Sequence, residues 1–221
     1  MSRELTWAER AFIRVERSLG EVTHGYFITF DEELIRQHGL MGFFRWARAT
    51  LRAQNELIAA FGETKFHLLA GFASLWNGCD YCAYGHVLAL NLCVFKETGQ
   101  LFPIDEAEVH ELLRLRDHEL QATLEARLGA SHPELFALVK RQLEVRVAEG
   151  PLQSDEDRLI LKSIALYEWV NECSITVDAP APPLGPIAKD RELRARYAAA
   201  RAEARTSKVA APAPVSAPSE P

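Results

Sequence analysis

The sequence contains no apolar run long enough to cross a lipid bilayer. Its longest apolar runs, 66–76 and 87–95, fall well short of the roughly 20 residues that a transmembrane helix requires. Charged residues occur throughout 1–20, so the chain also lacks the basic segment and apolar core of a secretory signal peptide. We therefore expect a cytoplasmic protein that does not act at a membrane.

An excess of positive charge is also missing. The 221 residues include 25 Lys and Arg against 31 Asp and Glu, which gives a formal net charge of −6. This balance argues against a general binding surface for nucleic acids or anionic lipids. With 48% hydrophobic residues, the chain can bury one sizeable core and still carry an appendage.

Cysteine is scarce, with only four residues in the chain. Cys79 and Cys82 form a CxxC pair, whereas Cys93 and Cys173 stand alone among apolar neighbours. In a reducing compartment this pattern indicates redox or metal chemistry more than a disulfide scaffold. We interpret the two single cysteines as small buried side chains.

No stretch alternates apolar and polar residues over the length of a strand. Apolar residues instead recur every three or four positions along most of the chain, which predicts an all-α fold. Asp31, Asp105, Ser154 and the pair Ser131 and Glu134 stand where N-terminal caps belong, and Gly20, Gly62 and Gly150 stand where helices end. The expected helices cover 3–19, 32–38, 40–61, 63–76, 79–95, 105–128, 131–150 and a segment that starts at 154.

The C-terminal part differs in composition from the main all-α domain, which we place at 1–177. Proline recurs across 178–188, which predicts an extended linker. The segment 189–208 holds seven Lys or Arg against three Asp or Glu and is rich in alanine, so we expect a basic helix. It is either a solvated helix or an arm that docks on an acidic partner. The Ala/Pro-rich tail 209–221 is expected to be disordered.

The stretch 66–95 is the most informative part of the chain. Asp80 is the only formally charged residue between Lys65 and Lys96. Two apolar helices, 63–76 and 79–95, are expected to form an antiparallel hairpin around a tight turn at 77–78. Small residues on both helices allow the backbones to approach closely, and this packing would bring His67 toward Cys82 and His86.

The CxxC pair suits dithiol chemistry. In the first turn of a helix, the α-carbons of Cys79 and Cys82 would lie roughly 5 to 5.5 Å apart, a separation that a disulfide tolerates. The positive end of the helix dipole stabilises a thiolate there. His86 lies one turn after Cys82 and can take the thiol proton. We favour Cys82 as the attacking nucleophile and Cys79 as the resolving cysteine, with the reverse assignment open.

The residues 77–86, Asn-Gly-Cys-Asp-Tyr-Cys-Ala-Tyr-Gly-His, form the pattern NGCxYCxxxH. This pattern resembles that of the alkylhydroperoxidase D-like proteins of the carboxymuconolactone decarboxylase superfamily, over roughly 40–98. The resemblance implies an all-α helical bundle and a homo-oligomer that is a trimer or a multiple of one. It also implies thiol–disulfide exchange in support of peroxide reduction, without a cofactor. The substrate would be a hydroperoxide or a disulfide, and a separate electron donor is required.

The chain departs from this family at one position. The family places a glutamate of its proton relay twelve residues before the first cysteine, and here that residue is His67. Glu63, one helical turn earlier, is a possible substitute. A histidine can also relay protons near neutral pH, or the relay can be weakened. We therefore include His67 with Cys79, Cys82 and His86 as candidate catalytic residues.

Other interpretations of the same residues remain open. His86 could serve as the acid or base of a cofactor-free decarboxylase, although an intact CxxC pair counts against this. The chain could also be a non-enzymatic oligomer with a redox-sensing or structural role. A zinc site formed by Cys79, Cys82, His86 and His67 is a minor alternative. In a continuous helix, Cys79 and His86 would lie about 10.5 Å apart along the axis, so both could reach one ion only when nearly extended.

Overall fold

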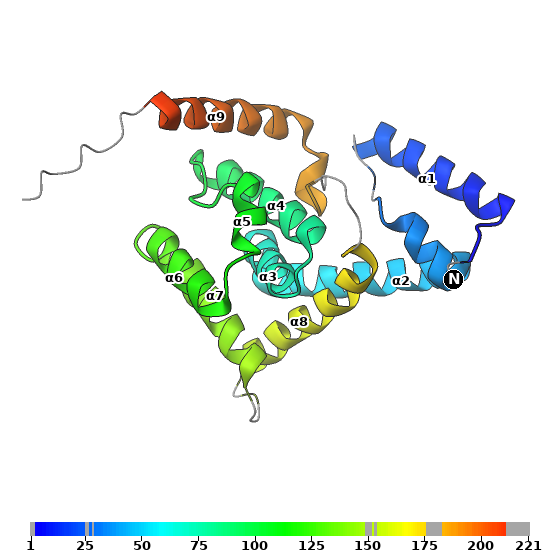
Figure 1. Ribbon diagram of the computed structural model, residues 1–221, viewed down its shortest axis with the longest axis horizontal. Helices are drawn as coiled ribbons and strands as arrows, with labels where there is room; N and C mark the ends of the chain where they lie inside the picture. The colour runs from blue at the N-terminus through cyan, green and yellow to red at the C-terminus, as the bar shows by residue number, and fades with distance from the viewer. Residues whose placement is uncertain are drawn as a thin grey trace, which may run out of the picture.

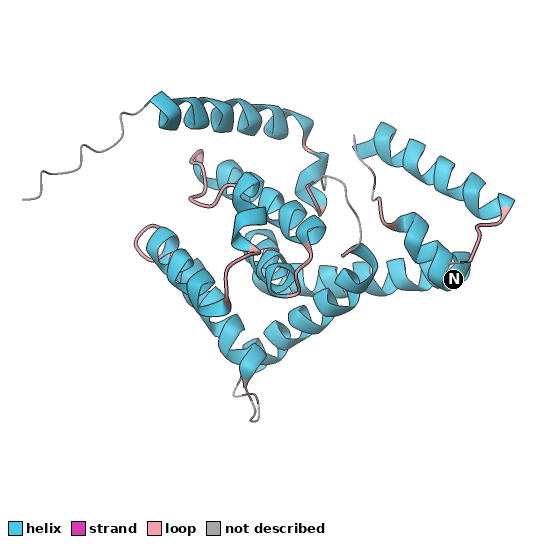
Figure 2. Cartoon of the chain, viewed as in Figure 1, coloured by secondary structure: helices cyan, strands magenta, loops and turns pink. Residues whose placement is uncertain are grey.

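The computed structural model describes residues 3–24, 27, 29–148, 152, 154–175 and 183–210. Every regular element in these ranges is a helix, which confirms the all-α prediction (Figures 1 and 2). None of the helices described is both long and apolar enough to span a membrane. The α-helices are α1 (Trp7–His24), α2 (Asp31–Phe61), α3 (Glu63–Trp76), α4 (Asp80–Thr98), α5 (Val109–Leu112), α6 (Asp117–Leu128), α7 (Pro133–Val147), α8 (Asp155–Ser174) and α9 (Arg191–Ala210), and the 3₁₀-helices are η1 (Glu106–Glu108) and η2 (Pro186–Lys189).

Helix α3 lies at the centre of the fold. All of its residues from Phe66 to Leu75 are buried, and it packs against α2, α4, α7 and α8 (Figure 1). A helix that is apolar on every side must be covered on every side, because each exposed face would leave hydrophobic area in water. The low charge of this stretch therefore explains its central position.

Helices α3 and α4 are joined by a two-residue turn at Asn77 and Gly78. Gly78 adopts a φ of 73°, a left-handed conformation that favours glycine. The two helices run in opposite directions, since Thr64 at the start of α3 donates to Glu97 near the end of α4 at 2.6 Å. A Cβ at Gly71 would lie 3.4 Å from Val87, so the small residue permits close packing.

The first two helices differ in detail from the expected 3–19 and 32–38. Thr6 and Glu9 form a reciprocal cap that starts α1 at Trp7, and the helix continues through Gly20 to His24. Asp31 is not an N-cap but the first residue of α2, and its carboxylate pairs with Arg17 of α1 at 2.7 Å. The break expected before residue 40 occurs at Gly39, whose φ is 70°.

The continuous helix expected over 105–128 is wrong. Asp105 does cap its start, since it accepts from the Ala107 N–H at 2.9 Å. The chain, however, leaves the helical path after α5 and starts again at α6. A new cap causes this restart, because the Arg116 N–H donates to the Glu119 carboxylate at 2.9 Å.

The two later caps have different outcomes. Ser131 was expected to cap the next helix, but its hydroxyl donates to the carbonyl of Arg127, and α7 starts at Pro133 with His132 as the N-cap. Proline at the first helical position needs no hydrogen-bond partner for its nitrogen, so it sets this boundary. The cap at Ser154 is confirmed, since its hydroxyl accepts from the Asp157 N–H at 3.1 Å.

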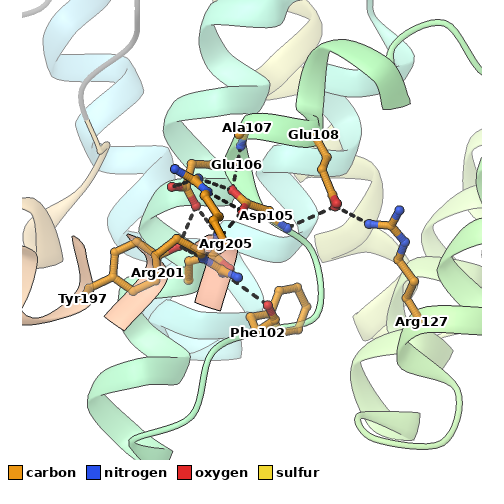
Figure 3. Close-up of polar contacts among 10 residues, drawn as sticks. Phe102, Asp105, Glu106, Ala107, Glu108, Arg127, Tyr197, Arg201 and Arg205 are labelled. Carbon is orange, nitrogen blue, oxygen red and sulfur yellow. Dashed lines mark hydrogen bonds and ion pairs between the residues drawn. The ribbon is translucent and has the colours of Figure 1, made fainter. Parts of the chain in front are cut away.

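Helix α9 was expected to be either solvated or available to a partner, but one of its faces is buried within the fold. Leu193, Tyr197 and Arg201 are buried against α4 and the segment before η1. Tyr197 donates to Glu106 at 2.5 Å, and Arg205 donates to Asp105 at 2.5 Å; Figure 3 shows how these side chains lie. Arg201 and Arg205 of α9 therefore lie against an acidic surface within the same chain.

The expected linker 178–188 and tail 209–221 fall partly outside the residues described. Within the linker, Leu184 donates its N–H to the carbonyl of Gly85 on α4 at 3.2 Å, and η2 follows directly. Residues 178–182 and 211–221 lie outside the described ranges. The placed part of the linker thus runs along α4 and reaches the candidate site.

Candidate functional site: a buried dithiol and a histidine pair

The two cysteines of the CxxC pair lie where α4 begins. Cys79 is the N-cap of α4, with an extended φ of −94° and ψ of 96°, so it precedes the helix instead of belonging to its first turn. Cys82 lies in the first turn. Both side chains are almost completely buried, with exposures of 0% and 1%, and neither forms a disulfide.

A serine from a distant part of the chain joins the two sulfur atoms. Ser174, at the end of α8, places its Oγ 3.3 Å from Cys79 Sγ and 3.0 Å from Cys82 Sγ. The same hydroxyl can donate to the carbonyl of Val170 at 3.2 Å. When a thiol loses its proton, the hydroxyl can turn and donate to the sulfur. Sequence reasoning missed Ser174, because a single serine at a helix end carries no local signal.

The environment favours ionisation of Cys79. Hydrogen bonding to the Cys82 thiol lowers the pKa of Cys79 to about 7, and the Ser174 hydroxyl adds to this effect. Burial and the Asp80 carboxylate oppose the shift. A group with a pKa near 7 is about half ionised at neutral pH. Cys79, which the sequence interpretation assigns as the resolving cysteine, is therefore partly a thiolate at neutral pH.

The structure brings together the two histidines that the sequence singled out. His67 Nδ1 on α3 lies 2.9 Å from His86 Nδ1 on α4, and both rings are buried. Because both atoms are ring nitrogens, one donates and the other accepts. Burial lowers the pKa of both histidines, and the proximity of His67 lowers that of His86 further. A neutral pair that holds one proton between the rings is thus favoured.

Tyr167 of α8 connects the histidine pair to the dithiol. Its ring is fully buried and contacts His86 edge-on, with the ring centres 4.8 Å apart. Burial raises the pKa of Tyr167 well above its usual value, and the proximity of Cys82 contributes to this rise. The hydroxyl accepts from Gln54 of α2 at 3.4 Å. His86 Nδ1 is held by His67, so proton transfer from His86 toward a thiol would have to use Nε2.

Glu63 stands on the other side of His67. Its Oε1 lies 3.9 Å from His67 Nε2, beyond hydrogen-bonding distance, and accepts the backbone N–H of Ile187 in η2 at 2.8 Å. The proximity of His67 lowers the pKa of Glu63, and the Ile187 N–H contributes, whereas burial opposes the shift. Glu63 therefore lies beside His67, one helical turn earlier on α3, without a hydrogen bond between the two side chains.

Possible metal ligands gather beside Glu63 and not at the CxxC pair. Within the described ranges, the one group of His, Cys, Asp or Glu side chains that could share an ion is Glu63, His67 and Cys93. Cys93 is buried, as expected, and burial together with nearby carboxylates raises its pKa to about 12. The side chain of Cys173, also expected to be buried, lies outside what the structure describes.

Comparisons with protein-family models, curated proteins and solved structures give no match to this chain.

Proposed function

We propose that the protein is a thiol–disulfide oxidoreductase of the alkylhydroperoxidase D-like kind, which reduces small hydroperoxides. One observation carries this proposal: Cys79 and Cys82 lie at the start of α4 and share the hydroxyl of Ser174. A shared donor can stabilise a thiolate on either sulfur as the reaction moves charge between them. A decarboxylase would have no use for a dithiol with a partly ionised cysteine, so the decarboxylase alternative is less well supported.

In this mechanism Cys79 is the nucleophile. Its thiolate attacks the terminal oxygen of a hydroperoxide ROOH, the O–O bond breaks, and a proton reaches the leaving alkoxide to give ROH. Cys79 becomes a sulfenic acid, so the sulfur is oxidised by two electrons and the peroxide is reduced by two. The lowered pKa of Cys79 supports this role.

Cys82 then acts as the resolving cysteine. Its sulfur attacks the sulfenic sulfur of Cys79, which forms the disulfide and releases water. An external dithiol donor reduces this disulfide through a mixed disulfide and is itself oxidised. The reaction requires no metal or organic cofactor. The burial of both sulfurs favours a small peroxide over a protein disulfide as the oxidant.

The histidine pair is the proposed source of the proton that the alkoxide needs. His86 packs against Tyr167, whose pKa is raised in part by the nearby Cys82, and His67 holds the other side of His86. His67 thus takes the position of the family's relay glutamate. Glu63, one helical turn earlier in the sequence, lies on the side of His67 that faces away from His86. In this arrangement His86 contributes to catalysis and His67 positions it.

We also propose a homo-oligomer in the cytoplasm. Met41, Phe44 and Leu51 are exposed on one side of α2, and burying them would remove apolar area from water. Cys79 and Cys82 are not joined in a disulfide, which suits a reducing compartment. Light scattering of the purified protein tests the first point, and a monomer at all concentrations would contradict it.

Sulfenic acid trapping tests the assignment of the two cysteines. In the Cys82→Ser variant, one equivalent of hydrogen peroxide should leave a sulfenic acid on Cys79, which dimedone traps and mass spectrometry locates. The Cys79→Ser variant should give little adduct on Cys82, and the wild type should give the Cys79–Cys82 disulfide. Adducts in the reverse order would overturn the roles. Equal labelling of the buried Cys93 would remove the case for a peroxide-reactive site.

The burial of the dithiol also supports a second candidate, a redox sensor that does not turn over. Disulfide formation would replace the contacts of both sulfurs with Ser174 and so disturb the end of α8. Peroxide consumption with dithiothreitol as the donor separates the two functions. Many turnovers per dithiol indicate the enzyme, whereas one turnover with a change in α8 protection from hydrogen exchange indicates the sensor.

A further inference from the structure

A second cluster of reactive side chains lies two helical turns along α4 from His86. Glu63 and His67 are four residues apart on α3, so both face α4, where Cys93 lies opposite them. One carboxylate oxygen, one ring nitrogen and the thiol sulfur of these residues all lie within 4.8 Å of one another. No step of the dithiol mechanism uses Cys93.

The Nε2 atom of His67 is a buried polar atom with no hydrogen-bond partner, which indicates that it binds a ligand. The His67 side chain is completely buried, and Nε2 has no hydrogen-bond partner, whereas Nδ1 is paired with His86. A buried polar atom without a partner is costly by about 1–3 kcal/mol. Glu63 Oε1 lies 3.9 Å from this atom. This separation is close to the roughly 3.4 Å between two ligands of one tetrahedral ion.

Gly185 keeps the space beside this atom open. It has a φ of 85°, and a Cβ built on it would lie 2.7 Å from His67 Nε2 and 2.6 Å from the neighbouring Cε1. Any side chain at this position would therefore occupy the edge of the ring that carries Nε2. The segment is fixed on both sides, because Leu184 donates to Gly85 and Ile187 donates to Glu63.

We propose that Glu63, His67 and Cys93 form a binding site for a divalent zinc ion. One thiolate, one imidazole and one carboxylate make a mixed sulfur, nitrogen and oxygen set that suits tetrahedral zinc, with the fourth position left for water. Glu63 is 29% exposed and provides the route from solvent. The site does not depend on the proposed dithiol function.

Neighbouring groups hold His67 in the tautomer, and Glu63 in the orientation, that zinc binding needs. With Nε2 on the ion, the His67 proton resides on Nδ1 and is donated to His86 Nδ1, which lies 2.9 Å away. The Ile187 N–H holds the Glu63 carboxylate. Zinc would thus connect α3, α4 and η2, and its binding would stabilise the folded chain.

Metal binding by a dithiol-free protein tests this site. The parent for the experiment is the full chain with Cys79→Ser and Cys82→Ser, because the CxxC pair could otherwise bind zinc itself. Competition with a chromophoric chelator should show one equivalent of Zn²⁺ bound. Co²⁺ should produce a thiolate charge-transfer absorption and the visible bands of tetrahedral coordination. No binding by this parent would overturn the proposal.

Ligand variants in this parent identify the residues. Cys93→Ala should abolish the cobalt–thiolate absorption, and both Cys93→Ala and Glu63→Gln should weaken zinc binding by about 100-fold or more, since even outer-shell changes cost 10- to 100-fold. Glu125→Gln removes an exposed carboxylate on α6 and should leave affinity unchanged. Circular dichroism of the metal-free variants checks that they fold. Unchanged zinc affinity in a folded Cys93→Ala or Glu63→Gln variant would overturn the site.

Discussion

His67 and His86 share one hydrogen bond between their Nδ1 atoms, at 2.9 Å, in the buried centre of the fold. This contact joins α3 to α4 and lies between two groups of reactive side chains. Beyond His86 are Tyr167 and the dithiol, and beyond His67 are Glu63 and Cys93. If one imidazole binds a ligand or moves its proton, the position of the proton on the other imidazole is set as well. The two sites are therefore coupled through a single proton position.

Substituting Gly185 should show how tightly the chain closes over His67. Gly185→Ala introduces a Cβ that would lie 2.6 Å from His67 Cε1, in addition to the strain of a positive φ. Gly62→Ala is the matched control, because its φ of 80° is similar and no atom lies within 4 Å of the added Cβ. We expect a loss of about 1–3 kcal/mol for Gly62→Ala and about 1–3 kcal/mol more for Gly185→Ala, measured by urea unfolding. Equal losses would show that contact with His67 adds nothing.

The sequence predicted the central elements well because their signals are local. The apolar run and the Asn77-Gly78 turn defined α3 and the start of α4 to within one residue. The reciprocal cap at Ser154 was equally clear. Where two local signals competed, the prediction failed, as at Ser131, because Pro133 set the start of α7. At 105–128 the weaker signal of a second cap at Arg116 was overlooked.

The rest of the candidate site could not be predicted, since it depends on contacts between distant segments. Ser174 reaches the cysteines from α8, and Gly185 reaches His67 from the segment before η2. Cys93 was interpreted as packing, which its burial fits, but its proximity to Glu63 and His67 follows only from how α3 crosses α4. Helical spacing shows which residues share one face of a helix, but it does not show which other segment packs against that face.

The acidic contact of α9 should contribute measurably to stability. Glu106 is buried and accepts from Asn91 at 2.8 Å and Tyr197 at 2.5 Å, with Arg205 at 3.2 Å. Glu106→Gln replaces an acceptor by an amide donor and removes the charge, so we expect a loss of about 1–3 kcal/mol in the free energy of unfolding. Glu203→Gln makes the same change at an exposed position of α9 and should alter stability little. Similar values for the two variants would mean that α9 is not held by this contact.

The α1–α2 contact should make stability depend on pH. Burial and the Asp31 carboxylate raise the pKa of Glu16 to about 7. The folded state therefore binds more protons than the unfolded state between about pH 4.5 and 7, and this contribution to stability falls as pH rises through that window. Glu16→Gln should match the wild type near pH 4 and be more stable at pH 8. Glu21→Gln, at an exposed site on α1, is the control. Parallel pH curves for wild type and Glu16→Gln in urea unfolding would contradict this account.

Removing the Ser174 hydroxyl should slow the dithiol reaction by making Cys79 less acidic. Hydrogen bonding to Cys82 and Ser174 lowers the pKa of Cys79 to about 7, so the loss of Ser174 leaves part of that effect. In Ser174→Ala the pH midpoint for peroxide-driven disulfide formation should move upward from about 7, and the rate at pH 7 should fall about 3- to 10-fold as the thiolate fraction declines. The rate above pH 9 should be nearly unchanged, because Cys79 is then ionised in both proteins.

Ser163→Ala removes a hydroxyl that is equally buried in α8 but has no hydrogen-bond partner, so it controls for altered packing of the helix. Disulfide formation followed by rapid acid quench and mass spectrometry gives both midpoints. If Ser174→Ala lowers the rate equally at every pH, Ser174 positions the sulfurs and does not stabilise the thiolate.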